Sequence, residues 1–517
     1  MLAQQQRVAV RPSRRSSLGV RAVAAPPARP TPAPPAPPQG GRPVPRLPGQ
    51  LPHLGLFGKV ELGKMFEYIS NEERRLGLRM VEVEVMGLKS VRLRHPEDIA
   101  QVVMKQHEKF AKGEMKGCVS EWLANGLATN RDPAHHAAVK EVMMPGFKPD
   151  AIRSYCHMFS DVADALARVL LEHEGQELDI EPLMQRATLD VIGLAGFSYD
   201  FRAVEMAGAE ARRRREAAEA GGDASEIDVG AVWARMMPPA MLLSIGLPMP
   251  EKWVPGHADF TGGVAELDRV AAHMMAEHRA GRVTGNRRSI LTYMMEAQEA
   301  GNGVMTDKQI RDELMTLMLA GSDTTATTLA FAIWELSRRP EAMARLLAEV
   351  EGVVGDKEGP VTAEDVARMP FLAGVVNESL RAYSAAPNTR RIATEDCQVG
   401  GYDIKAGTSL ILDIWALHRN DEFWPRADEW LPERWLPENA PSLAPHASTA
   451  FMPFSVGPRS CIGRYFALLE AQVLLAQLVR RVGFGPAARP PISLVQQLTL
   501  ASEGGIYAVP RARAASA

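Results

Sequence analysis

The chain has 517 residues, is 46% hydrophobic and 23% charged, and carries a formal net charge of −3 at pH 7. These values are ordinary for a globular protein and give no whole-chain basic signal for nucleic-acid binding. The four cysteines, Cys118, Cys156, Cys397 and Cys461, are few and widely spaced, which argues against a disulfide framework.

The first 49 residues differ in composition from the rest of the chain. No Asp or Glu occurs before Glu61, whereas five arginines lie between residues 7 and 21. This composition is typical of an organelle transit peptide, and the proline-rich run 26–49 predicts an extended linker without a core. The alternative is a disordered tail. We expect a plastid location, with the mitochondrion as the alternative, and one folded domain over residues 50–517.

The next segments predict a small β-rich region followed by many helices. Residues 80–99 alternate apolar and polar side chains, which predicts a hairpin and then a helix. The chain is almost wholly helical in pattern from 150 to 339, and 182–197 is apolar on more than one face, as in a core helix. Residues 232–250 are apolar but interrupted by prolines. They form either a buried connection or a lid that touches a membrane or admits an apolar substrate.

A long apolar stretch, 310–337, predicts a buried helix and contains the sequence AGSDTT at 320–325. Asp323 and Thr324 fall inside that helix. Their side chains could simply bond back to the helix backbone. The alternative is that a functional site uses them, because such groups disfavour a buried helix otherwise.

Two short motifs carry charges downstream of that helix. In ESLR, 378–381, Glu378 and Arg381 are three residues apart on a predicted helix and can pair. Such a pair is usually a solvated surface feature worth a few tenths of a kcal/mol. PERW, 432–435, supplies Arg434, and the intervening segment 401–417 predicts two short strands around a Lys-Ala-Gly turn.

The last cysteine lies in FSVGPRSCIG, residues 454–463, directly before a predicted helix. Its thiolate could be a nucleophile, a zinc ligand or a haem ligand. Zinc needs about four ligands, and this neighbourhood offers one. Gly457 allows a tight turn, and Gly463 lets a helix start close to a flat cofactor. Phe454 could shield the sulfur, and Arg459 could reach an anionic carboxylate.

The pattern F-x-x-G-x-R-x-C-x-G, formed by Phe454, Gly457, Arg459, Cys461 and Gly463, resembles the haem-binding signature of the cytochrome P450 family. AGSDTT, ESLR and PERW follow the family's order, and the resemblance covers roughly residues 47–509. It implies a mainly α fold with minor β structure and a β-rich lobe near the N-terminus. It also implies haem b between the AGSDTT helix and the helix after Cys461, with Cys461 as the axial ligand of the iron.

The resemblance implies roles for further residues. Thr324 would hold a water by hydrogen bond, and Asp323 would relay protons. Glu378, Arg381 and Arg434 would form a buried triad beneath the haem.

The haem propionates would be contacted by Arg391 and by two residues of the segment HHAAVK, His136 and Lys140. The family more often has Trp at the position of His136 and Arg at the position of Lys140. Arg390, next to Arg391, could contact the propionate in its place.

The implied function is that of a monooxygenase, which inserts one oxygen atom from dioxygen into a lipophilic substrate such as a carotenoid, sterol or fatty acid. A separate ferredoxin or flavin reductase would supply electrons. A docking surface would include Arg459, Arg464, Arg480 and Arg481, and residues 232–250 would touch a membrane peripherally.

Three alternatives remain at this stage. One is a haem-thiolate enzyme that rearranges lipid hydroperoxides without external electrons. The others are a haem protein that only binds or senses a ligand and a thiol enzyme without haem. The acid–threonine pair, Asp323 and Thr324, favours the monooxygenase over the first two, and the remaining motifs argue against the last.

Overall fold

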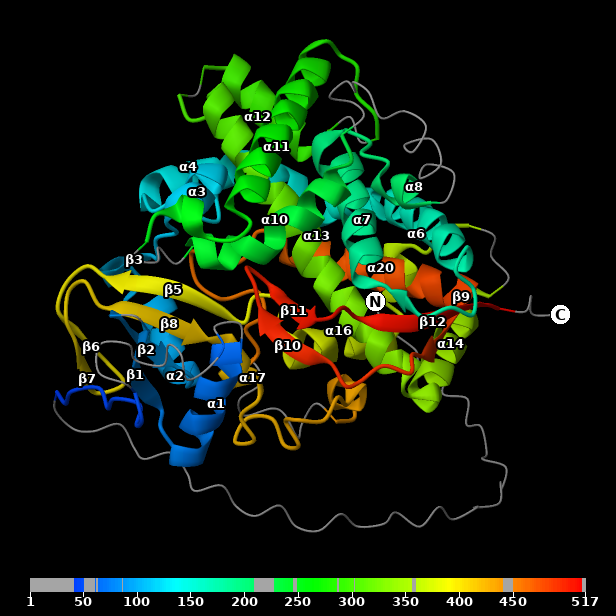
Figure 1. Ribbon diagram of the computed structural model, residues 1–517. Helices are drawn as coiled ribbons and strands as arrows, with labels where there is room; N and C mark the ends of the chain where they lie inside the picture. The colour runs from blue at the N-terminus through cyan, green and yellow to red at the C-terminus, as the bar shows by residue number, and fades with distance from the viewer. Residues whose placement is uncertain are drawn as a thin grey trace, which may run out of the picture.

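The computed structural model describes residues 41–50, 61, 64–85, 87–208, 227–244, 249–285, 288–301, 303–355, 359–439 and 450–513. Residues 1–40, which hold most of the expected presequence, lie outside the described part. The fold is mainly α with minor β structure, as predicted, and Figure 1 shows the helices gathered on one side and the largest sheet on the other.

The helices differ widely in length. They are α1 Met65–Leu76, α2 Pro96–Ala100, α3 Gly117–Leu123, α4 Pro133–Met143, α5 Pro149–Ser154, α6 Cys156–Leu171, α7 Glu181–Ile192, α8 Ala203–Ala207, α10 Val229–Ser244, α11 His257–Arg279, α12 Ile290–Glu299, α13 Asp307–Ser337, α14 Pro340–Val354, α15 Ala363–Val366, α16 Pro370–Ala382, α17 Ile414–His418 and α20 Arg464–Arg481.

The strands form four sheets. The largest sheet has the order β1-β2-β8-β5-β3, and the others are β10-β11, β4-β12-β9 and β6-β7. The strands are β1 Met80–Val85, β2 Leu88–Leu93, β3 Phe110–Lys112, β4 Leu178–Asp179, β5 Asn388–Ala393, β6 Cys397–Val399, β7 Tyr402–Ile404, β8 Ser409–Asp413, β9 Val482–Pro486, β10 Ser493–Gln496, β11 Leu500–Glu503 and β12 Tyr507–Ala512.

The helical part is organised around α13, which has 31 residues. At 1.5 Å per residue it is about 46 Å long. Its N-terminus is capped by Thr306, whose hydroxyl accepts a hydrogen bond from the backbone N–H of Gln309. α7, α16 and α20 all pack against α13, and Figure 1 shows it crossing the middle of the helical part. The expected long helix is therefore the spine of the domain.

The predicted hairpin is present as β1 and β2, which pair antiparallel, and α2 follows it. The two strands expected around the Lys-Ala-Gly turn also form, as β7 and β8. They do not pair with each other, because β7 pairs with β6 while β8 lies between β2 and β5. β8 runs parallel to β2 and antiparallel to β5, so it joins the N-terminal hairpin to the segment that leads to the cavity.

The end of the proline-rich segment packs on this sheet, in contrast to the linker without a core expected up to residue 49. Leu47 is only 2% exposed and clusters with Met65, Ile69 and Val81. The backbone N–H of Leu47 donates to the carbonyl of Glu82. Leu47, with Val44 packed against a second cluster and the backbone bonded to Glu82, extends the folded part to residues before 50.

The apolar segment 232–250 is a buried helix over its first part. α10 contains Pro238 and Pro239 and buries Trp233 and Met236 among other apolar side chains. Residues 245–248 lie outside the described part, and Met249 beyond them is 41% exposed. In the described part of the chain, every helix is too short or too polar to cross a membrane.

Candidate functional site

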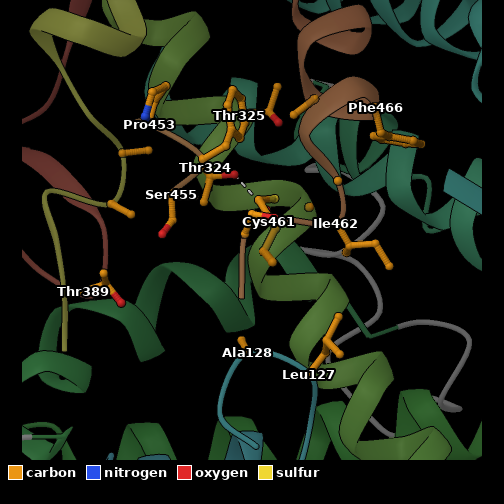
Figure 2. A pocket seen from close by; sticks show the side chains of 18 of the residues that line it. Leu127, Ala128, Thr324, Thr325, Thr389, Pro453, Ser455, Cys461, Ile462 and Phe466 are labelled. Atoms are coloured by element: carbon orange, nitrogen blue, oxygen red, sulfur yellow. Dashed lines mark hydrogen bonds between the residues drawn. The ribbon is translucent and has the colours of Figure 1, made fainter. Parts of the chain in front are cut away.

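The Cys461 side chain lies on the wall of an internal cavity of about 350 Å3. Cys461 is accessible, and its side chain is one of those that line this cavity. α13, α20, the first part of β5 and the segment around Cys461 form the other walls. Figure 2 shows Leu127 and Ala128 on the side of the cavity away from Pro453 and Phe466.

The turn before Cys461 is fixed by backbone hydrogen bonds. The N–H of Cys461 donates to the carbonyl of Phe454 at 2.9 Å, and the N–H of Ser460 donates to the carbonyl of Gly457 at 3.0 Å. Gly457 has φ of +80°, and a Cβ there would collide with the carbonyl oxygen of Val103. Only glycine fits both the left-handed backbone and this close approach.

Gly463 has a different role from Gly457. It is the residue before α20, and its backbone has an ordinary negative φ of −84°. A Cβ there would lie 3.8 Å from the sulfur of Cys461 and 3.7 Å from the ring of Phe147. Burial raises the pKa of the Cys461 thiol, while the Gly463 backbone N–H and the charge of Lys140 act in the opposite direction. Without a metal partner, the sulfur therefore carries a proton at neutral pH.

α13 presents Thr324 to the cavity and turns Asp323 away from it. The Thr324 hydroxyl donates to the carbonyl of Ala320 at 2.8 Å. The Asp323 carboxylate accepts hydrogen bonds from Gln185 Nε2, at 2.9 Å, and from the hydroxyl of Thr499. Asp323 is 2% exposed, and burial raises the pKa of its carboxyl. Thus the adjacent residues of AGSDTT lie on different faces of the helix.

A cluster of cations forms one rim of the cavity: Lys112, Arg391 and Arg459, with His136 beside them. Among the described residues, no carboxylate forms an ion pair with any of these three cations. Burial and the nearby arginines lower the pKa of Lys112 to about 7, and burial lowers that of Arg391 to about 10. Burial, followed by Arg459, lowers the pKa of His136 to about 4. Buried positive charges without a partner are costly, so the rim is suited to an anionic ligand.

Two other basic residues expected near this ligand lie elsewhere. Lys140 does not line the cavity, and its ammonium donates to the carbonyl of Pro458 at 3.3 Å. It is one helical turn beyond His136 on α4, and its long side chain reaches the cysteine segment instead. Arg390 is exposed while Arg391 is buried, because neighbouring side chains on β5 point to opposite faces.

Glu378, Arg381 and Arg434 form a buried cluster beside the cavity. Both Arg381 and Glu378 have 0% exposed side chains, and two hydrogen bonds of 2.8 and 2.9 Å join them. Arg434 Nε reaches the same carboxylate at 3.2 Å. Arg381 also donates to the carbonyls of His418 and Ala427. The cluster therefore ties α16 to the long irregular segment that follows α17.

Several residues of the site have no motif in the sequence. His418 is fully buried, with a pKa lowered to about 3 by burial, and its Nε2 accepts the backbone N–H of Met452. Glu470 is 0% exposed and lines the cavity, and burial raises its pKa well above the usual value. Lys112 and Thr499 likewise have no motif in the sequence. Their positions depend on contacts between distant segments, which no local pattern records.

The residues present fit haem on the observations above. The cavity offers one sulfur donor, Cys461, from the segment before α20 and a different wall from α13. Its unpaired cationic rim matches the two carboxylates of a haem, and the remaining lining is mainly apolar. The cavity offers no preformed zinc site among the described residues, because its zinc-type donors, Cys461, His136 and Glu470, do not lie within 4.8 Å of one another.

The comparison with family models decides the assignment: the Cytochrome P450 model matches residues 45–507. The chain belongs to the cytochrome P450 family. Members of this family use haem, act on lipophilic substrates and generally need redox partners. The chain is accordingly a cytochrome P450 monooxygenase.

Individual relatives of this cytochrome P450 are distant. It is 26% identical to Cytochrome P450 4V2 of Rattus norvegicus, covering 90% of this chain and 89% of the relative. It is 28% identical to Protein LUTEIN DEFICIENT 5, chloroplastic, of Arabidopsis thaliana, covering 81% and 70%. It is 29% identical to Cyclooctatin synthase of Streptomyces melanosporofaciens, covering 81% and 85%.

Solved structures show the same architecture. The crystal structure of the cytochrome P450DA heme domain superimposes with a TM-score of 0.77 at 25% sequence identity. The match covers 92% of this chain and 98% of that domain. This cytochrome P450 therefore has the fold of the family's haem domains, in agreement with the mainly α prediction.

Proposed function

We propose that this cytochrome P450 uses haem b to insert one oxygen atom from dioxygen into a lipophilic substrate, with electrons from a separate redox protein. One observation carries the proposal: Cys461 and Thr324 line different walls of one mainly apolar cavity, whose rim holds unpaired cations. Haem, when bound, supplies the iron at which two electrons and two protons activate dioxygen.

Cys461 would hold the haem iron through its sulfur. Its side chain lines the cavity, and the turn at Gly457 holds it there. Iron binding requires the thiolate, so the thiol proton leaves when the metal binds. Arg459, Arg391 and Lys112 are assigned to the two carboxylates of the cofactor, because they line the cavity and form no ion pair with a carboxylate of the described residues.

Asp323 and Thr324 are assigned to the management of protons. The hydroxyl of Thr324 uses its hydrogen to bond Ala320, so its oxygen remains able to accept a bond from a water in the cavity. Asp323 is a buried acid whose pKa is raised by burial, which favours its proton-carrying form and suits a proton donor. Transfer from Asp323 toward Thr324 requires its carboxyl to turn away from Thr499 and Gln185.

The substrate is a lipophilic molecule such as a carotenoid, sterol or fatty acid. Apart from its cationic rim, the cavity is lined mainly by apolar side chains, among them Leu127, Ile192, Leu317 and Val376. Burial of apolar substrate surface against such a lining drives binding. Two relatives have names that refer to lutein, a carotenoid, and to cyclooctatin, which supports a lipid-like substrate.

A plastid is the proposed location, with the mitochondrion as the alternative. The acid-free N-terminal composition supports it, as does the word chloroplastic in the name of the Arabidopsis relative. In a plastid the donor would be a ferredoxin rather than a flavin reductase. Trp253 and Met249, which are 68% and 41% exposed, support peripheral membrane contact at the end of segment 232–250.

Isotope labelling tests the reaction type. The purified protein, a reduced ferredoxin system and a panel of lipids are incubated under 18O2, and products are read by mass spectrometry. One 18O atom per product, with strict dependence on the electron donor, supports the proposal. Conversion of lipid hydroperoxides without electrons and without 18O would overturn it in favour of a rearranging enzyme.

A further inference from the structure

A second group of ligand-type side chains lies away from the haem cavity. The sulfur of Cys118, one carboxylate oxygen of Glu251 and one ring nitrogen of His257 lie within 4.8 Å of one another. None of these three residues lines the cavity of Cys461. Their donors are one thiol, one carboxylate and one imidazole, which is a mixed set typical of transition-metal sites.

The fold brings these residues together through aromatic packing. The ring of Trp122, on α3, contacts those of Trp233, on α10, and Phe260, on α11, with centroids 5.7 and 5.6 Å apart. Cys118 precedes Trp122 by four residues, and His257 precedes Phe260 by three. Residues three or four apart share a helix face, so the packing of the rings sets Cys118 beside His257.

Glu251 is held at the same point by the backbone. The N–H of Cys118 donates to the Glu251 carboxylate at 3.2 Å. Glu251 begins a short 3-10 helix in which the N–H of Val254 bonds back to the carbonyl of Glu251. The N–H of His257 then bonds to the carbonyl of Val254 at 3.1 Å. Two successive tight turns therefore separate Glu251 from His257. The carboxylate and the imidazole both lie beside Cys118 at the start of α3.

Among the described residues, the carboxylate of Glu251 accepts hydrogen bonds from the backbone N–H and the thiol of Cys118. Cys118 is a free thiol. The His257 ring forms no hydrogen bond there, and Glu251 forms no ion pair with a described cation. The Glu251 carboxylate keeps free lone pairs beside its bond from the Cys118 backbone N–H, so a carboxylate, a thiol and an imidazole that face one another are suited to a shared cation.

We propose that Cys118, Glu251 and His257 bind one Zn2+ ion, with a water as the fourth ligand. Zinc binds sulfur at about 2.3 Å and nitrogen or oxygen at about 2.0–2.2 Å, so its tetrahedral ligands are about 3.3–3.8 Å apart. The donors, within 4.8 Å of one another, reach that spacing by small side-chain rotations. The thiol proton passes to solvent on binding, because the thiolate is the ligand. Thiolate and imidazole disfavour Mg2+ and Ca2+, which prefer oxygen ligands.

The ion would join two segments that are far apart in sequence. It would connect the start of α3 to the connection between α10 and α11, where Lys116 N–H already donates to the carbonyl of Ser244 at 3.2 Å. A ligand that binds only the folded form stabilises it. Zinc should therefore raise the thermal midpoint of the protein without entering the haem cavity.

Calorimetric titration tests the site in the full-length protein, which keeps its haem after a chelator has removed other bound metal ions. Zn2+ is the titrant, and the variants are Cys118→Ser, Glu251→Gln and His257→Ala. Cys397→Ser is the matched control, because Cys397 is another free, partly buried cysteine that lies in β6. We expect one Zn2+ per chain, affinity at least ~10-fold weaker in each ligand variant, and unchanged affinity in the control.

Folding defects in one variant do not obscure the result. His257 is at the first turn of α11 and only partly buried, so His257→Ala should fold even if Cys118→Ser does not. Zinc should also raise the thermal midpoint of the parent and of Cys397→Ser but not of His257→Ala. Absence of Zn2+ binding to the parent, equal affinity in His257→Ala and parent, or equally tight binding of Mg2+ would overturn the proposal.

Discussion

The hydroxyl of Thr499 donates a hydrogen bond to the carboxylate of Asp323, although 176 positions separate the two residues. Thr499 lies immediately before β11, whereas Asp323 lies in the middle of α13. This bond holds the acid on the side of the helix away from the cavity and favours its ionised form. The position of Asp323 therefore depends on a C-terminal strand as well as on its own helix.

Replacing Asp323 and Thr499 should affect the reaction differently. Asp323→Asn removes the acid, and we expect turnover to fall by ~10²-fold or more. Thr499→Val removes a bond that favours the carboxylate, so the pKa of Asp323 should rise further. The acid then keeps its proton to higher pH, and the descending limb of the rate–pH profile should move to higher pH. Steady-state rates over a pH series measure both effects.

Thr261→Val is the control for this pair, because among the described residues its hydroxyl bonds only to backbone carbonyls of its own helix, α11. Its rate–pH profile should match that of the parent. An unchanged profile in Thr499→Val would contradict the assigned role of the bond.

Lys112→Met should weaken haem retention. The ammonium of Lys112 lines the cationic rim and lacks an anionic partner among the described residues, so a haem carboxylate would be its counter-ion. We expect faster transfer of haem to an acceptor protein such as apomyoglobin, measured by absorbance. Lys109→Met is the control, because Lys109 pairs with Glu395 on the surface. Haem loss from Lys112→Met at the parental rate would contradict the assignment.

Without haem as its counter-ion, the buried ammonium of Lys112 should lower the stability of the folded protein. The folded-state pKa of Lys112 is lowered to about 7 from 10.5, mainly by burial. Below pH 7 both states are protonated, and the folded state carries the full cost of the buried charge. As pH rises from about 7 toward 10.5, the unfolded chain binds more protons, so stability should increase. Urea unfolding over this range should show that increase in the parent and a flatter dependence in Lys112→Met.

Glu378→Ala should destabilise the whole domain. It leaves the fully buried guanidinium of Arg381 without its carboxylate, and removing one partner of such a pair typically costs ~3–5 kcal/mol. We expect reduced haem content and a lower midpoint in denaturant unfolding. Lys405→Ala, which removes a solvent-exposed ion pair with Asp396, should leave both unchanged. Normal haem content and stability in Glu378→Ala would show that the cluster is dispensable.

The electron donor should dock near Arg464 and not near Arg481. The sequence suggested one surface for both, but they lie at opposite ends of α20, about 25 Å apart. Arg481 also pairs with Asp164, whereas Arg464 is exposed at the end next to Cys461. We expect Arg464→Glu to slow reduction by an acidic ferredoxin about 10-fold and to reduce its salt dependence. Equal effects of Arg464→Glu and Arg481→Glu would contradict this location.

Local patterns predicted much of the architecture. The alternation over residues 80–99 identified the first hairpin, and the long apolar run identified α13. The cysteine motif identified the segment that lines the cavity, because Gly457 encodes a turn that other residues cannot adopt. These features depend on neighbours within a few residues, and so a sequence records them directly.

Contacts between distant segments could not be predicted in the same way. Lys112 and Arg391 come together because β3 pairs with β5. The sequence does not indicate this pairing. It does not indicate that Thr499 bonds Asp323, or that Cys118 meets His257. The separate pairings of β7 and β8 were also missed, because the turn between them predicts a hairpin while the sheet order depends on the whole fold.

The most direct test of the account is the absorbance spectrum of the dithionite-reduced protein with carbon monoxide, recorded for the parent, Cys461→Ser and Cys397→Ser. If Cys461 is the thiolate ligand of haem, the parent and Cys397→Ser should show a strongly red-shifted Soret band, and Cys461→Ser should lack it. A red-shifted band that persists in Cys461→Ser, or a haem-loaded parent without such a band, would contradict the assignment of the site.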